Sequence, residues 1–559
     1  MQKKVQKLQN LINVLDRKIQ TANLSHSQTE GWANFCAQFK MGRLEARDIV
    51  VGCEIAIAVG HNKKANDILI IAYDLMPTSF IVLEALVQTF RNLSQDKTAE
   101  NLLRKYLDEN PDNWDVTRLL GRLYFHTDQK DKHVELVTGY IVSHPNHVAA
   151  RIELATQKLT SHAPDIEQSL LDILAIEAHN LYALSQLVQY YAKSTDFTCA
   201  NTYLEKVQRL YPDEALTRFC EGFIYEVRLD FDKALKSYDQ ALNINSHFIE
   251  AYGKSGEMMH KLGLDLEEAW YRLEARFPQL LGRPDGPFWR GESLTGKYLI
   301  IWAEQGLGDQ LSFASMLRDL PNDIGRVDVE CDEKLVPFFK RSYPEYNVYP
   351  RRAKRPGGHD FHSPIGAIAR YLRPSYESFT KTPIRHLIPD EKHVVKWKEW
   401  IDGLGSGLKV GLCWRSGVTS VVRKRDAIDL CDDLTHVLKM KDVVFINLMY
   451  GEGDDELNLV QEKLGVHIHQ PPNLNQFEDV DQTAALIKTL DVTVGVATSP
   501  IGLAQAVGCD NVLLYSGDPG ELAPLWWPGT TYFNRSFDED WTKAVEQLHC
   551  YLENHPDRK

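Results

Sequence analysis

A repeating unit in the first half of the chain limits its fold more than any other feature of the sequence. The positions that close successive units are Pro77, Pro111, Pro145, His179, Pro212 and Ser246. They are spaced by 34, 34, 34, 33 and 34 residues. A fixed period of this length is typical of stacked helix pairs, each of which buries its apolar face only against its neighbours. The first half is therefore predicted to be a curved α-solenoid.

Small and aromatic residues occupy matching positions inside these units. They are Gly222, Tyr225, Ala234, Tyr238 and Ala241 after Pro212, with Gly121, Tyr124 and Ala99 at the same phase in earlier units. The pattern resembles the tetratricopeptide repeat, which implies a concave face that holds an extended peptide or a partner protein. A spacer that merely carries the second half is the alternative. We place the solenoid at residues 46–280, after a helical N-terminal cap at 1–45.

After residue 280 the pattern changes from helices alone to short β-branched runs that alternate with helices. The expected strands are 297–303, 326–331, 346–350, 409–414, 443–449, 466–470, 492–497 and 511–516. This alternation is typical of parallel sheets with crossover helices. A second break, at 385–407, predicts two doubly wound, Rossmann-like lobes, a first lobe at 285–388 and a second lobe at 389–559. The fold class expected for the whole chain is α + α/β, with a ligand cleft at the carboxyl ends of the strands.

Charge and cysteine content exclude several function classes. The formal net charge of the 559 residues is −14 and the pI is near 5.8, which argues against a nucleic-acid partner. The nine cysteines are scattered without a CxxC pair, as in a reduced cytoplasmic protein. The longest apolar run, at 49–60, is too short to span a bilayer, and we expect neither export nor a membrane span.

The segment EQGLGDQLSF, residues 304–313, follows an expected strand and begins an expected helix. Gly306 and Gly308 would let the backbone turn sharply and approach a ligand closely. Asp309 falls in the first helical turn, where a carboxylate facing the cleft could take a proton from an acceptor hydroxyl. Asp309 could equally be a helix N-cap with no chemical role.

The second lobe offers a matching half-site for an anion. Residues 491–516 are expected to form a strand, a turn, a helix and a strand, with Thr498 at the turn, Ser499 as the N-cap and Pro500 and Ile501 opening the helix. Free backbone N–H groups there suit a diphosphate. Trp414, Arg415 and Arg425 follow the strand at 409–414, and we favour the two arginines as diphosphate ligands over a solvated basic loop.

Motif order makes a resemblance specific. WRGESLTGK, EQGLGDQ, HDFHSPIGAIAR, VGLCWRSG and the segment 481–508 occur in the order seen in bacterial proteins that join tetratricopeptide repeats to a two-lobed GT-B glycosyltransferase module. The module resembles heptosyltransferases and, more distantly, protein O-GlcNAc transferases, and the layout is similar to that of flagellin glycosyltransferases. The resemblance implies sugar transfer from a nucleotide-sugar to a protein hydroxyl, without a metal or other cofactor. Asp309 is then the expected base. His362, in a loop expected to border the cleft, could be an alternative base, an acceptor contact or a loop histidine with only structural hydrogen bonds.

Two departures from the family leave other functions open. Ala497 and Gly502 stand where relatives carry an Asp and a His that hold the diphosphate. The chain could therefore be a catalytically silent repeat scaffold with a degenerate module, or an assembly chaperone that acts through the repeats alone. The acidic pair Asp479 and Asp481 imitates a metal-binding motif, but we interpret Asp481 as a helix N-cap and predict no metal site.

Overall fold

The computed structural model describes residues 2–558 except 20–25, 42–44, 59–60, 94, 128, 162, 164, 276–283, 285, 304–305, 352, 354, 418–425, 452 and 537–538. These residues belong to two compact units, Met1–Ala183 and Leu184–Lys559. Within the described part of the chain, no helix combines the length and the apolar character that crossing a membrane requires.

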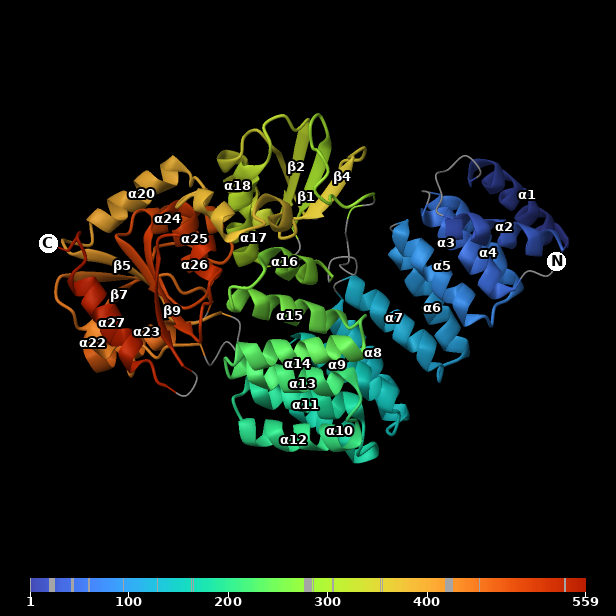
Figure 1. Cartoon of the computed structure of the whole chain (residues 1–559), viewed down its shortest axis with the longest axis horizontal. Coiled ribbons are helices and arrows are strands. Elements are labelled where there is room, and N and C mark those ends of the chain that lie inside the picture. Colours follow the sequence, from blue (N-terminus) through green and yellow to red (C-terminus); the bar gives the residue numbers. More distant parts are fainter. Residues whose placement is uncertain are drawn as a thin grey trace. The chain divides into compact units, whose positions relative to one another are not determined.

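The described residues of the first unit are mainly helical (Figure 1). The helices are α1 (Gln2–Ile19), α2 (His26–Lys40), α3 (Ala46–Ala58), α4 (Asn62–Leu75), α5 (Phe80–Asn92), α6 (Asp96–Glu109), α7 (Trp114–His126), α8 (Lys130–Ser143), α9 (Val148–Ser161) and α10 (Ile166–Ile176). One apolar core runs from α1 to α7. Ala65, Ala72 and Ala99 in this core have no exposed surface. Side chains this small let neighbouring helices pack closely.

The second unit begins with helices of the same kind and continues into two parallel sheets. Its helices are α11 (Leu181–Lys193), which starts at the end of the first unit, α12 (Phe197–Leu210), α13 (Ala215–Val227), α14 (Phe231–Ile244), α15 (Ile249–Lys261), α16 (Leu266–Glu274), α17 (Leu307–Phe313), α18 (Val336–Ser342), α19 (Ala369–Leu372), α20 (Glu391–Asp402), α22 (Thr435–Leu438), α23 (Asp454–Leu464), α24 (Val480–Lys488), α25 (Ser499–Val507), α26 (Ala523–Trp526) and α27 (Thr542–Glu553). Three 3-10 helices, η2 (Ala314–Asp319), η3 (Glu333–Leu335) and η4 (Tyr376–Lys381), lie in the first lobe.

The helical repeat is confirmed. All six marked positions lie in turns that join one helix pair to the next. The first helices of the pairs, α5, α7, α9, α11, α13 and α15, begin at residues 80, 114, 148, 181, 215 and 249. The small and aromatic positions also pack as expected, because a Cβ added to Gly222 of α13 would stand only 2.8 Å from the buried ring of Tyr238 in α14.

The first lobe contains a four-stranded parallel sheet in the order β3-β2-β1-β4. Its strands are β1 (Tyr298–Trp302), β2 (Arg326–Cys331), β3 (Asn347–Pro350) and β4 (Phe361–Pro364). Strand β1 is central and almost entirely buried, as expected for an apolar run between two neighbours. Helix α17 follows β1 in the chain, so residues 306–313 lie at the carboxyl edge of this sheet.

The second lobe contains a six-stranded parallel sheet in the order β10-β9-β8-β5-β6-β7. Its strands are β5 (Leu408–Cys413), β6 (Val443–Asn447), β7 (Ile468–His469), β8 (Val492–Gly495), β9 (Asp510–Ser516) and β10 (Thr530–Arg535). Helices α24 and α25 cover one face and α27 the other (Figure 1). Strand order reverses between β5 and β8, and parallel sheets of this order bind ligands at that point.

The predicted parallel sheets are confirmed, but two of their strands were missed. The segment at 360–364, interpreted as a loop, is the edge strand β4, and β10 follows the two tryptophans at 526 and 527. Both are short or only half-buried, and neither shows the apolar run that marks the other strands. Pairing with a neighbouring strand, which depends on distant residues, makes them strands.

The division into compact units falls inside the repeats, at 183/184, rather than at the change of sequence pattern near 280. Helix α16 explains why. Its Leu266, Trp270 and Leu273 belong to the same apolar core as the two sheets. Trp270 Nε1 also donates a hydrogen bond to the carbonyl of Arg373, 3.3 Å away. The last repeats therefore pack as part of the α/β unit.

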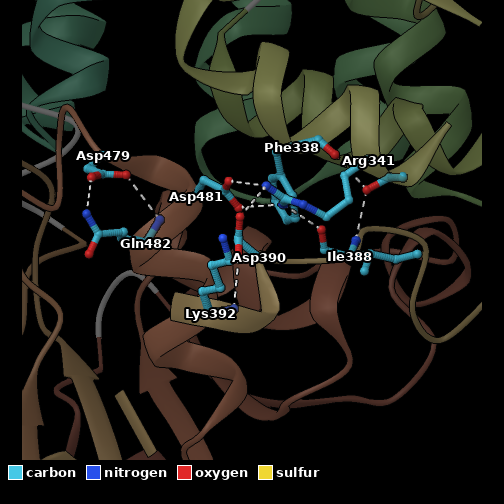
Figure 2. Close-up of polar contacts among 9 residues, drawn as sticks. Phe338, Arg341, Ile388, Asp390, Lys392, Asp479, Asp481 and Gln482 are labelled. Atoms are coloured by element: carbon cyan, nitrogen blue, oxygen red, sulfur yellow. Dashed lines mark hydrogen bonds and ion pairs between the residues drawn. The ribbon is translucent and has the colours of Figure 1, made fainter. Parts of the chain in front are cut away.

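The structure also corrects the interpretation of Asp481 as the N-cap of α24. Asp479, not Asp481, is the N-cap, and its side chain accepts a hydrogen bond from the backbone N–H of Gln482 at 3.1 Å. Figure 2 shows Asp481 directed instead at Arg341 of the first lobe. In the sequence, either of two acids that are two residues apart could be the N-cap. Only the tertiary contact of Asp481 with Arg341 distinguishes them.

Candidate functional site

Asp309 lies on the first turn of α17, exposed to solvent. The N-cap of this helix is Gly306, so the interpretation of Asp309 as an N-cap is wrong. Gly306 has φ −66°, and the φ of Gly308 is not positive either, so neither glycine is required for an unusual backbone turn. A Cβ at Gly306 would lie 3.8 Å from Oδ2 of Asp309, so the N-cap glycine and the carboxylate are neighbours.

Helix α17 packs on α25 of the second lobe. A Cβ at Gly502 of α25 would lie 3.6 Å from Leu311 of α17. Gly502, the position at which the resemblance would place a histidine, therefore faces the helix that bears Asp309. The segment between the lobes lies at the same junction, where the N–H groups of His386 and Leu387 both donate to Ala506 O at 3.0 Å.

His386 was not predicted and is a central residue of this junction. Its ring is buried, and Nε2 lies 2.8 Å from the carbonyl oxygen of Leu311, to which it donates. Burial lowers the pKa of His386 to about 4, so the ring is neutral at pH 7. A histidine in a linker gives no sequence signal of this kind, because its depth depends on how the two lobes pack.

His362 is held inside the first lobe. It lies on β4 with about 1% of its surface exposed. Trp302 Nε1 donates to its Nδ1 at 3.2 Å, and its Nε2 lies 3.2 Å from the carbonyl oxygen of Gly286. Phe288 packs on the ring, with centroids 4.5 Å apart. Through these contacts, His362 links β4 to β1 and to residues 286–288, which precede β1. They assign His362 a structural role.

In the second lobe, α25 begins one residue earlier than predicted. Thr498 is the N-cap residue, Ser499 is the first helical residue and Pro500 the second. The Thr498 hydroxyl donates to Val496 O at 3.0 Å and lies 3.2 Å from Cys413 Sγ, so it joins the ends of β5 and β8. Pro500 and Ile501 are buried. Ser499 is half-buried, so its hydroxyl and backbone N–H groups of this turn are the groups that could contact an anion.

Arg415 forms an ion pair with Glu456 of α23. Its Nε donates to Oε1 at 2.9 Å, and its Nη2 donates to Oε2 at 2.7 Å. A diphosphate would have to compete with this carboxylate for the guanidinium. Trp414 is buried beneath it, 2% exposed, and contributes packing. Arg425 lies outside the described residues.

A cavity of about 980 Å³ opens at the carboxyl ends of β5, β6 and β7, and none of the described residues that line it was among the predicted site residues. We call it the carboxyl-edge pocket. Amide side chains line it, from Asn447, Gln470, Asn473, Asn475 and Gln476. Tyr450 and Phe477 stack to form an aromatic wall, with ring centroids 5.9 Å apart and planes 28° from parallel. Asp454 is the one charged residue among the described residues that line it. Such a lining suits an uncharged ring that carries hydrogen-bonding groups.

Two smaller cavities, of about 180 and 440 Å³, lie beside the last repeats, and we call them the junction cavities. The smaller is lined by the repeats and both lobes, and the larger by the repeats and the second lobe. Both are lined by Glu257, His260 and Trp526. Phe313 of α17 lines the smaller one. Asp309 and Phe313 are four residues apart on α17, so they project from the same side of that helix.

Comparison with known proteins identifies one curated relative. The chain is 29% identical over 489 residues to Protein FlbA of Caulobacter vibrioides (strain ATCC 19089 / CIP 103742 / CB 15), covering 79% of each chain. No protein-family model matches.

Solved structures offer weaker likenesses. The APC/C hetero-tetramer Cut9-Hcn1 matches with a TM-score of 0.28 and 14% identity over 42% of this chain and 46% of that one. A human IFIT1 dimer with m7Gppp-AAAA matches with a TM-score of 0.27 and 12% identity, over 45% of this chain and 74% of that one. At TM-scores this low, neither likeness bears on the ligands of this chain.

Metal binding has no obvious donor set in the described residues. They contain no group of three or more His, Cys, Asp or Glu side chains placed to hold an ion. Asp479 and Asp481, the pair that imitates a metal motif, point to different partners.

Proposed function

We propose that the chain is a glycosyltransferase that moves a sugar from a nucleotide-sugar to a hydroxyl group of a protein, with flagellin as one candidate acceptor. One observation carries the proposal. The helix that bears the exposed Asp309 packs against α25, whose N-terminus lies at the strand-order reversal of a doubly wound sheet. An acid from one lobe and an anion-binding turn from the other thus belong to one junction.

The carboxyl-edge pocket fits the nucleoside part of the donor. Its amides offer both donors and acceptors, and its aromatic wall offers a surface on which a base can stack. The Asp454 carboxylate can accept hydrogen bonds from ribose hydroxyls, as an acid after the second strand of such sheets commonly does. In this arrangement the diphosphate points towards the first turn of α25.

The junction cavities fit the approach of the acceptor. The smaller one lies between the last repeats and Phe313, which projects from the same side of α17 as Asp309. A peptide held by the repeats could reach Asp309 along this route. Burial raises the pKa of Glu274, which lines the smaller cavity and pairs with Arg370 at 2.7 Å. Beyond this pair, the two cavities are lined by Glu226, Glu257, Asp518 and Lys261, so acidic side chains outnumber basic ones along the route.

The proposed chemistry is a direct displacement. Asp309 takes the proton of the acceptor hydroxyl while the hydroxyl oxygen forms a bond to the anomeric carbon of the sugar. The bond from that carbon to the diphosphate breaks, and the diphosphate leaves with the electron pair. Backbone N–H groups at the first turn of α25 stabilise the charge that develops on it. Following the resemblance, the proposal needs no metal ion.

The test begins with thermal unfolding of the chain in the presence of UDP-, GDP-, CMP- and ADP-sugars, since a ligand of the folded state raises the apparent stability. The active sugar is then used in a transfer assay. Asp309→Asn should keep the thermal shift and lower transfer by about 100-fold or more, the usual contribution of a general base. Glu345→Gln, which neutralises another exposed acid of the first lobe, should leave transfer unchanged. Undiminished transfer by Asp309→Asn would remove Asp309 from the mechanism.

One observation favours a second candidate, a catalytically silent scaffold. Arg415 is already neutralised by Glu456, and Gly502 offers no side chain to a diphosphate. If the chain is a silent scaffold, none of the four sugar nucleotides should raise the unfolding temperature of the unaltered chain. None should raise that of Glu456→Gln either, a variant in which the Arg415 guanidinium no longer has its carboxylate partner. A shift that appears only in Glu456→Gln would show that the ion pair suppresses donor binding.

A further inference from the structure

Two cationic side chains from one stretch of the first lobe, η3 and α18, reach the second lobe. Arg341 donates from Nη1 to Asp481 Oδ1 at 2.9 Å and from Nη2 to Oδ2 at 2.7 Å (Figure 2). Its Nη1 also donates to the carbonyl of Ile388 in the segment between the lobes, 3.0 Å away. Arg341 therefore fixes the first lobe to the start of α24.

Lys334 contacts the residues just before α24. Its Nζ donates to Phe477 O at 3.0 Å, lies 3.3 Å from the Glu478 carboxylate, and stands 3.5 Å from the centroid of the Phe477 ring. Phe477 is 55% exposed, which is unusual for a ring of this size and leaves few apolar contacts to hold it. A cation over the ring face supplies an attraction that exposure does not remove.

Phe477 is at the same time a wall of the carboxyl-edge pocket. Its other neighbour is Tyr450, on the loop after β6, with which it stacks. The adjacent Gln476 donates from Nε2 to Asn447 O, at the end of β6, at 2.8 Å. The segment 475–478 is thus held by the second lobe on one side and by Lys334 of the first lobe on the other.

We propose that Lys334 is a positioning residue through which the first lobe becomes part of the pocket wall. It holds Phe477 in the stack with Tyr450, where an uncharged planar ring of a ligand can pack. A change in the arrangement of the lobes moves Lys334 and loosens the wall. Because coupling is reciprocal, a ligand that packs on the wall also favours the arrangement in which Lys334 contacts it. The ligand half of the inference rests on the proposed function, whereas the contact between lobes does not.

The first test needs no ligand. Amide hydrogen exchange is compared for the unaltered chain, Lys334→Met, Lys334→Arg, and Lys340→Met as a matched control on the same stretch, where Lys340 is exposed. Lys334→Met should speed exchange several-fold in both 475–479 and 447–451, and Lys334→Arg, which keeps a cation over the ring, should restore it. Faster exchange confined to 475–479, or none, would overturn the coupling.

The second test uses UDP, GDP, CDP and ADP as probes in equilibrium binding. For any probe that binds the unaltered chain, Lys334→Met should weaken binding by about two- to fivefold, the range of an exposed cation–π contact, and Lys334→Arg by much less. Equal affinities for the unaltered chain and Lys334→Met would overturn the inference. If no probe binds the unaltered chain, the proposed function loses its donor site, and the exchange experiment alone decides the role of Lys334.

Discussion

The ion pair between Arg341 and Asp481 leads to a quantitative prediction. Asp481 keeps 11% of its side-chain surface exposed and Arg341 keeps 28%, and the pair is bidentate. Breaking a fully buried pair costs about 3–5 kcal/mol, because a charge is left without a partner, whereas an exposed pair contributes about 0–1 kcal/mol. The intermediate exposure places the cost of Arg341→Met at about 2–3 kcal/mol.

A double-mutant cycle isolates the pair from the other contacts of each residue. Asp481→Asn alone should cost about 2 kcal/mol, and the double variant should cost little more than Arg341→Met, which gives a coupling energy of about 2 kcal/mol. Arg341→Met also loses the hydrogen bond to Ile388 O, and both Arg341 variants share that loss, so it cancels in the cycle.

The assay should report on α24 itself, since a chain with two compact units need not unfold in one step. Hydrogen exchange of the α24 amides, measured across a urea series, gives the opening free energy of that helix. Lys398→Met removes an ion pair to Asp402 in which both side chains are 58% exposed, and should change the opening free energy by less than about 0.5 kcal/mol. A cost below about 1 kcal/mol for Arg341→Met, or full additivity with Asp481→Asn, would falsify the reasoning.

Two further predictions concern pH and the repeats. Burial lowers the pKa of His386 to about 4 from the ordinary 6.5, so the unfolded chain takes up a proton first as the pH falls below 6.5. The stability that neutral His386 contributes is complete above that pH and is lost towards pH 4. The free energy of unfolding should fall by about 2 kcal/mol between pH 7 and 5. Urea unfolding at the two pH values should show a smaller loss in His386→Gln. In the repeats, a Cβ at Gly222 would stand 2.8 Å from the ring of Tyr238, whereas one at Gly253 meets nothing within 4 Å. Gly222→Ala should therefore lower the midpoint of thermal unfolding, at a cost of about 1–2 kcal/mol, and Gly253→Ala should raise it slightly; equal effects would contradict this packing.

The candidate site was predictable only where local pattern decides the structure. The strand, turn and helix around Asp309 and around Thr498 follow from apolar runs that end in turn residues, and both exist. The partners of the charged residues were not predictable. No residue near Arg415 in the sequence predicts that its partner is Glu456, which is 41 residues away. The lining residues of the carboxyl-edge pocket were missed for the same reason, because they come from loops after three different strands.

The sequence by itself determined the helical repeat and the alternation of strands and helices. Both are set by the spacing of apolar, small and turn-forming residues within about 34 residues of chain, a range over which backbone geometry dominates. Only the tertiary structure decided that the last repeats share a core with the sheets, that His362 is buried, and that Lys334 and Arg341 join the two lobes. These depend on contacts between residues far apart in the chain, whose energies vary with burial and geometry that no local pattern encodes.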